Sequence, residues 1–125
     1  MFIPTNPNPF NKLTGDCVIR AISIAEGKDW DDVYLELMIK GYEQKDMIEN
    51  NALWNEYLHR LGYHRYIIPD TCPDCYTVSD FAADHPQGTY ILGTGTHAVC
   101  VKNGNIHDTY DSGYKVPIFY WQKER

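Results

Sequence analysis

The feature that most constrains this chain is an almost wholly apolar segment that begins with a cysteine. Residues 17–25 would carry apolar side chains on nearly every side of a helix, which predicts a buried helix and not an amphipathic one. Gly15 and Asp16 predict a turn and an N-cap before it, and Gly27 predicts its end. A thiol at Cys17 would feel the unpaired N–H groups and the positive end of the helix dipole, which favour the thiolate. Cys17 is therefore the first candidate for a nucleophile.

Length and composition narrow the class of protein. The chain has 125 residues, 43% of them hydrophobic, and we expect one domain with its own core over residues 1–125. No apolar run approaches the roughly 20 residues that cross a bilayer, and the N-terminus lacks the basic and apolar regions of a secretory signal. We therefore expect a cytoplasmic protein without a membrane partner. Its four cysteines should then be reduced thiols, not a disulfide framework.

Charge argues against one large group of partners. The net charge is −6, and the lysines and arginines are scattered along the chain without forming a patch. Nucleic acid is therefore not expected as a partner. The oligomeric state leaves no signal in the sequence.

Helical patterns come first along the chain and β patterns follow. That order predicts an α+β fold, with N-terminal helices packed on a C-terminal antiparallel sheet, and not alternating βαβ units. Residues 1–10, rich in proline and asparagine, predict an extended arm. The expected helices begin at residues 17, 29, 50 or 51 and 77, and the first three end at Gly27, Gly41 and Gly62; the expected strands cover 63–68, 88–92, 97–101, 106–110 and 116–121.

A hairpin turn places two polar residues near each other. Asn103 and Gly104 stand between two apolar runs, which is the strongest short-range signal for a two-residue turn. If they form the turn, Val99 pairs with Asp108, and His97 pairs with Tyr110. Because side chains alternate between the two faces of a sheet, His97 and Asp108 then share a face as diagonal neighbours, roughly 7 Å apart. Cys100 points to the other face and is expected in the core.

Cys17, His97 and Asp108 together supply the parts of a nucleophilic triad. The imidazole would take the thiol proton, and the carboxylate would orient the ring and stabilise the imidazolium. The Cys17 backbone N–H and one side-chain amide would meet an oxyanion on the substrate carbonyl. Asn11, six residues before the cysteine, is the expected amide donor.

The order of these residues resembles that of the papain-like cysteine peptidase superfamily. The resemblance rests on Asn11, on Gly15-Asp16-Cys17 opening a buried helix, on the run from Gly95 to Val99 around His97, and on Asp108. In particular, the chain resembles small bacterial and phage members of the bacteriocin-leader-peptidase type. Asn11 replaces the more usual glutamine of that superfamily, and the step from His97 to Asp108 is shorter than in papain.

The resemblance implies a papain-like minimal core and a catalytic role for each matched residue. Cys17 would be the nucleophile, His97 the general base and acid, Asp108 the orienting residue and Asn11 the oxyanion donor. The implied activity is that of a thiol peptidase or isopeptidase, acting on a peptide or protein through an acyl-enzyme. Two alternatives stay open, which are an acyl or γ-glutamyl transferase using the same triad and a non-catalytic phage or host interaction protein with this fold.

The pair Cys72 and Cys75 forms a C-x-x-C motif with several possible roles. Half of a zinc site is one, but no second C-x-x-C or paired histidine stands at the usual spacing. A thioredoxin-like redox pair is another, but it requires a βαβ context that this chain lacks. A surface turn is the preferred interpretation, so neither a metal nor a cofactor is expected.

Overall fold

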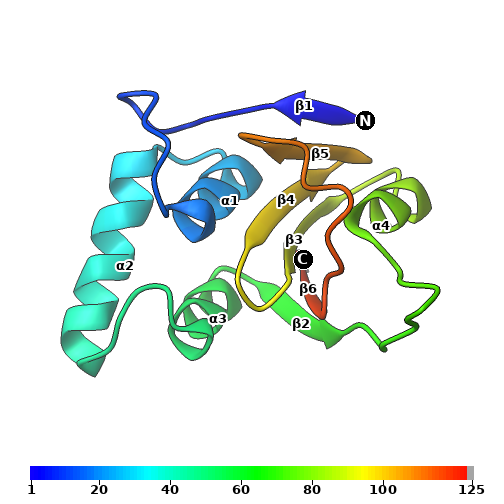
Figure 1. The fold of residues 1–125 in the computed structure, drawn as a ribbon. Coiled ribbons are helices and arrows are strands. Elements are labelled where there is room, and N and C mark those ends of the chain that lie inside the picture. Colours follow the sequence, from blue (N-terminus) through cyan, green and yellow to red (C-terminus); the bar gives the residue numbers. More distant parts are fainter. Residues whose placement is uncertain (124–125) are drawn as a thin grey trace.

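The computed structural model describes residues 1–123 and has an α+β fold, so the α+β part of the prediction is confirmed (Figure 1). Four helices and six strands form it. In chain order the elements are β1 (Phe2–Pro4), α1 (Cys17–Glu26), α2 (Trp30–Gln44), α3 (Asn51–Arg60), β2 (Tyr63–Ile67), α4 (Val78–Asp84), β3 (Thr89–Gly93), β4 (Ala98–Lys102), β5 (Asn105–Asp108) and β6 (Phe119–Lys123).

The six strands form a single mixed sheet in the order β1-β5-β4-β3-β6-β2. The sheet differs from the predicted antiparallel one at one edge. Phe2 to Pro4, predicted to lie in an extended arm, pair in parallel with Ile106 to Asp108 of β5. The remaining pairs are antiparallel, as predicted. The N-terminal residues thus cover the open edge of β5, which would otherwise expose unpaired N–H and C=O groups.

The helices divide between the two faces of the sheet (Figure 1). On one face α1 packs against the strands β3, β4 and β5, α2 packs beside α1, and α3 packs against α2 and β2. Ile22 of α1 and Trp54 of α3 belong to the core on that face. On the opposite face the short α4 packs on β5, and Phe81 contributes to a second core with Val99 and Val101. The first residue of the buried α1 thereby lies beside the start of β4, where its thiol meets the Ala98 backbone.

The start of α1 differs from the prediction in its capping. Gly27 ends the helix with a φ of 64°, as predicted. Asp16 occupies the N-cap position, but its side chain makes no capping hydrogen bond. It is buried and accepts a hydrogen bond from Arg20 instead, at 2.8 Å. A full charge at Arg20 inside an apolar helix needs this partner more than the backbone N–H groups do.

The helix α2 continues past its predicted end. It runs to Gln44, beyond the predicted end at Gly41, and Lys45 takes the left-handed conformation at its C-cap. Gly41 lies inside the helix, where a Cβ atom would approach the Asp46 carbonyl oxygen to 2.8 Å. The glycine is thus explained by this close approach of the following loop, not by the helix end.

The β4–β5 hairpin has the predicted turn. Asn103 and Gly104 both have positive φ, at 52° and 77°, as a turn matched to the strand twist requires. Lys102 pairs with Asn105, and the register continues to Cys100 and His107. The predicted register is confirmed over these pairs. Beyond them the paired strands end, and His97 lies in the turn that precedes β4.

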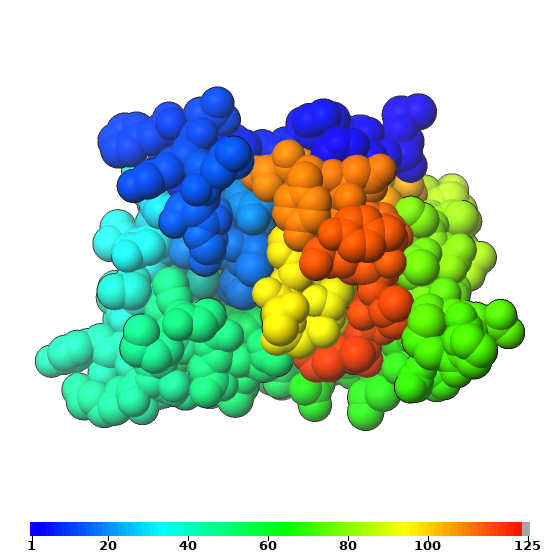
Figure 2. Space-filling view, viewed as in Figure 1, coloured from blue at the N-terminus to red at the C-terminus, as the bar shows by residue number. Residues whose placement is uncertain are grey.

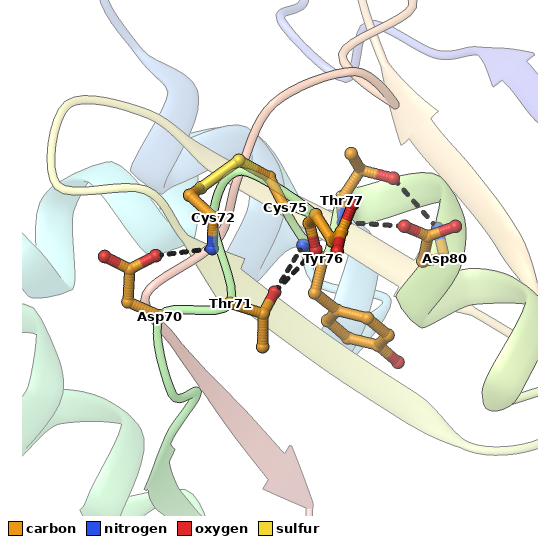
Figure 3. Close-up of a disulfide and its surroundings, with 8 residues drawn as sticks. Asp70, Thr71, Cys72, Cys75, Tyr76, Thr77 and Asp80 are labelled. Carbon is orange, nitrogen blue, oxygen red and sulfur yellow. Dashed lines mark hydrogen bonds between the residues drawn. A yellow bond between two sulfur atoms is a disulfide. The ribbon is translucent and has the colours of Figure 1, made fainter.

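The four cysteines are not all reduced, contrary to the prediction. Cys72 and Cys75 form a disulfide in the loop between β2 and α4 (Figure 3). The loop folds back on itself because the Thr71 hydroxyl donates to the Asp74 carbonyl and accepts from the Tyr76 N–H. This leaves the two cysteine Cα atoms 4.1 Å apart. The preferred interpretation as a surface turn therefore missed a covalent link, while Cys17 and Cys100 are free thiols.

We expect Trp121→Ala to lower the free energy of unfolding by about 3–5 kcal/mol, the usual range for removal of a large aromatic side chain from a core. Trp121 is fully buried, its ring lies 4.4 Å from that of Trp54, and its Nε1 donates to Asn55 at 2.6 Å. Urea denaturation measures the change. Tyr114→Ala is the control, since its side chain is 70% exposed and its loss should cost under about 0.5 kcal/mol. Equal effects of the two changes would contradict this packing.

Candidate active site

The structure brings Cys17, His97 and Asp108 together where three segments meet. Cys17 is the first residue of α1, His97 immediately precedes β4, and Asp108 ends β5. His97 Nε2 lies 2.6 Å from Asp108 Oδ2. The imidazole also shares a hydrogen bond with the Cys17 thiol. Since the carboxylate occupies Nε2, the other ring nitrogen, Nδ1, is the one left to hydrogen-bond the sulfur. Figure 2 shows these segments meeting at the surface, in blue, yellow and orange.

A tight turn fixes the backbone of His97. The Thr94 N–H donates to the His97 carbonyl at 2.9 Å, and the His97 N–H donates to the Thr94 hydroxyl at 3.1 Å. Gly95 has a φ of +97°, a conformation that L side chains rarely adopt. The glycine and threonine residues before His97 therefore shape the turn that directs the imidazole toward Cys17.

The Asp108 carboxylate is buried and fully hydrogen-bonded. Its side chain is 1% exposed. Oδ1 accepts from Arg20 Nη1 and from the Thr109 N–H, each at 2.8 Å. Oδ2 accepts from the Ser112 hydroxyl at 2.7 Å in addition to His97. A carboxylate held by four donors stays ionised in spite of its burial.

Arg20 joins the triad to the start of α1, a connection that the sequence reasoning missed. Its guanidinium lies between Asp108 and Asp16, with Nε 2.8 Å from Asp16 Oδ1. Asp16 Oδ2 also accepts from Trp30 Nε1 at 2.9 Å. The signal for this connection was present in the sequence, since an arginine in an otherwise apolar helix, four residues after an aspartate, requires buried partners.

The surroundings of each triad member shift its pKa in the direction that favours the ionised form. Burial opposes ionisation of Cys17, but hydrogen bonds from His97 and the Ala98 N–H, with positive charge on His97 and Arg20, lower its pKa below the ordinary value. Burial likewise disfavours the imidazolium, yet the hydrogen bonds to Asp108 and Cys17 and their negative charge raise the pKa of His97 to about 9. Burial alone would raise the pKa of Asp108, but its four hydrogen-bond donors lower this pKa to about 2. The site thus favours the thiolate–imidazolium pair over the neutral thiol and imidazole.

The backbone at the start of α1 is available to an oxyanion. Within residues 1–123 the Cys17 N–H has no hydrogen-bond partner, because it lies in the first helical turn and the Asp16 side chain does not cap it. Asn11, the predicted second donor, lies elsewhere. It is on an exposed turn with a φ of 54°, its Oδ1 accepts from Asn6, and it lines neither cavity beside Cys17. The structure therefore brings together the three triad residues but not Asn11.

Two cavities flank the nucleophile and share the residues Cys17, Thr96 and His97. The larger, of about 440 Å³, extends toward Leu13 and Tyr110. The ring centroid of Tyr110 is 5.3 Å from that of His97. The smaller, of about 180 Å³, extends toward α3. A substrate that crosses Cys17 would thus find a hollow on each side of the sulfur.

Residues 1–123 hold no group of three or more histidine, cysteine, aspartate or glutamate side chains arranged to bind a metal ion. The described helices are all too short or too polar to span a bilayer.

Cys100 is fully buried, and burial raises the pKa of its thiol to about 12. Of the two free thiols, Cys17 alone has an environment that promotes its ionisation.

The chain matches no protein-family model, no curated protein and no solved structure. The case for a function therefore rests on the geometry of the site.

We expect iodoacetamide to alkylate Cys17 at a lower pH than an ordinary thiol requires, because only the thiolate reacts and the pKa of Cys17 is lowered. In His97→Ala the hydrogen bond and the positive charge are lost, so the midpoint of the rate profile should move to higher pH. Peptide mapping of the alkylated protein against pH measures both profiles, with buried Cys100 as the internal unreactive control. Identical midpoints in the two proteins would contradict the pairing of Cys17 with His97.

Proposed function

We propose that this protein is a cysteine-dependent hydrolase that cleaves peptide or isopeptide bonds through an acyl-enzyme on Cys17. The single observation that carries the proposal is the position of His97, whose ring joins the Cys17 thiol on one side to the buried Asp108 carboxylate on the other. Nucleophile, base and orienting carboxylate in series are the components of a hydrolytic triad. We further propose that the chain has the papain-like arrangement, in which a buried helix presents the nucleophile to a base held by the sheet.

The reaction proceeds in two steps. In the first, the Cys17 thiolate attacks the carbonyl carbon, and a C–S bond forms while the amide C–N bond breaks. The His97 imidazolium gives its proton to the departing amine, and the Cys17 N–H stabilises the developing oxyanion. In the second step, His97 takes a proton from water, whose oxygen attacks the thioester. The C–S bond breaks, the carboxylic acid leaves, and the thiolate–imidazolium pair is restored.

The buried ion network supports this assignment beyond the triad itself. Arg20 and Ser112 hold Asp108, and Asp108 holds His97 by Nε2, which leaves Nδ1 for the hydrogen bond to Cys17. Fixed orientation of a catalytic group contributes to rate because no reorganisation is needed during the reaction. The hollows on both sides of Cys17 fit a substrate chain that extends in both directions from the cleaved bond.

We expect Cys17→Ala to abolish turnover of a peptide and isopeptide library while the protein stays folded. His97→Ala should lower the rate roughly 10²- to 10⁴-fold, the usual contribution of a general acid and base. Mass spectrometry of products and of the Cys17 thioester, with circular dichroism for folding, provides the measurements. The matched control is Cys100→Ala, which removes the other free thiol and should retain turnover.

Turnover that survives in Cys17→Ala would remove Cys17 from the mechanism. Added amines separate hydrolysis from transfer, since an acyltransferase would give the amine adduct in preference to the free acid. Either product requires the same acyl-enzyme.

A further inference from the structure

The smaller cavity beside the nucleophile has an acidic rim. Its lining includes Glu49, from the segment before α3, together with Trp54 of α3 and the turn at Gly95 and Thr96. Cys17 and His97 line the same cavity. A group bound there is therefore in direct reach of the reacting atoms.

The Glu49 carboxylate is unpaired within residues 1–123. It makes no hydrogen bond or ion pair with the described residues, whereas Glu26, Glu36 and Glu56 each have a lysine partner. The ammonium group of nearby Lys45 lies over the Tyr42 ring, 4.0 Å from its centroid. The negative charge at the cavity rim thus remains available to a ligand.

The floor of the cavity is apolar. Trp54 is 2% exposed, and its Nε1 is already used in a hydrogen bond to Asn51 Oδ1 at 3.0 Å. Val18 and Ala98 add aliphatic surface. An apolar floor below a carboxylate suits a side chain with a long aliphatic stem and a cationic end, as in lysine and arginine.

Size and charge distinguish this cavity from its neighbour. At about 180 Å³ it is smaller than the usual pocket for a whole small-molecule ligand and fits a single side chain. No lysine or arginine lines it. The larger cavity has Arg20 in its lining, but two carboxylates already neutralise that guanidinium. Of the two cavities, the smaller has an unpaired carboxylate in its lining and the larger has none, so a positive substrate group is attracted to the smaller one.

We propose that the smaller cavity is the subsite for a lysine or arginine side chain of the substrate, and that Glu49 determines this specificity. The inference rests on the proposed function, because it gives the substrate class of the same site. Glu49 contacts the substrate side chain and takes no part in bond cleavage.

Two matched pairs of Cys17-directed reagents test the subsite. The first pair is the chloromethyl ketones of acetyl-lysine and acetyl-norleucine, and the second is the iodoacetyl derivatives of lysine amide and norleucine amide. The two pairs place the side chain on opposite sides of the sulfur, and norleucine lacks only the ammonium group of lysine. The second-order rate constant of Cys17 alkylation is the measured quantity, with unsubstituted iodoacetamide as the reference reagent.

In at least one pair we expect the lysine reagent to react roughly two- to fivefold faster than the norleucine reagent, as an ion pair with the exposed Glu49 gives. Glu49→Gln should abolish this preference, and Glu49→Lys should reverse it. The control is Glu43→Gln, which removes the same charge from an exposed position of α2 outside the cavity and should retain the preference.

Equal rates for lysine and norleucine in both pairs would overturn the subsite, as would a preference that survives Glu49→Gln. Failure of the proposed function has a different signature. In that case iodoacetamide itself reacts with Cys17 no faster than with an ordinary thiol, whatever the charge of the side chain.

Discussion

The structure depends most on the hydrogen bonds that the buried Asp108 carboxylate accepts. An ionised carboxylate with 1% exposure is stable only when its oxygens are fully bonded, because desolvation of an unpaired charge is costly. Its four donors come from α1, from the turn before β4 and from the segment after β5. One side chain thereby fixes the relative positions of the segments that carry Cys17 and His97.

Charges of alternating sign extend from this carboxylate in both directions. Asp16, Arg20 and Asp108 form a buried series, which His97 and Cys17 continue once they ionise. Arg20 has two effects within it. It compensates both carboxylates, and its positive charge helps lower the pKa of Cys17. Stability and thiol reactivity thus rest on the same residues, and removal of Arg20 would leave two buried carboxylates short of a partner.

The local features of this fold could be predicted from the sequence. The apolar run after Cys17 and the glycine at Gly27 indicated α1, and Asn103-Gly104 fixed the hairpin register. Both signals act within a few residues, so the sequence contains all the information needed. The register in turn indicated the carboxylate partner of His97, even though the regular ladder ends at Cys100 and His107, before either residue.

Features that depend on distant contacts could not be predicted in the same way. The strand β1 has three residues and gains its partner only when β5 is in place. Asp16 bonds Arg20 and does not cap the helix because both side chains are buried. Asn11 was expected near Cys17 from its spacing alone, yet the turn that contains it directs it to Asn6. Glu49 reaches the site because the loop between α2 and α3 returns toward α1, which no local pattern indicates.

The protonation state of His97 is the most direct test of the thiolate–imidazolium pair. Nitrogen NMR of the imidazole rings against pH measures it, with His97→Gln identifying the resonances among the five histidines. The account predicts an imidazolium at pH 7 that loses its proton with a pKa of about 9. It also predicts that the pKa of His97 is lower in Cys17→Ala, because the negatively charged sulfur is removed. A neutral His97 ring at pH 7 in the unmodified protein would contradict the account.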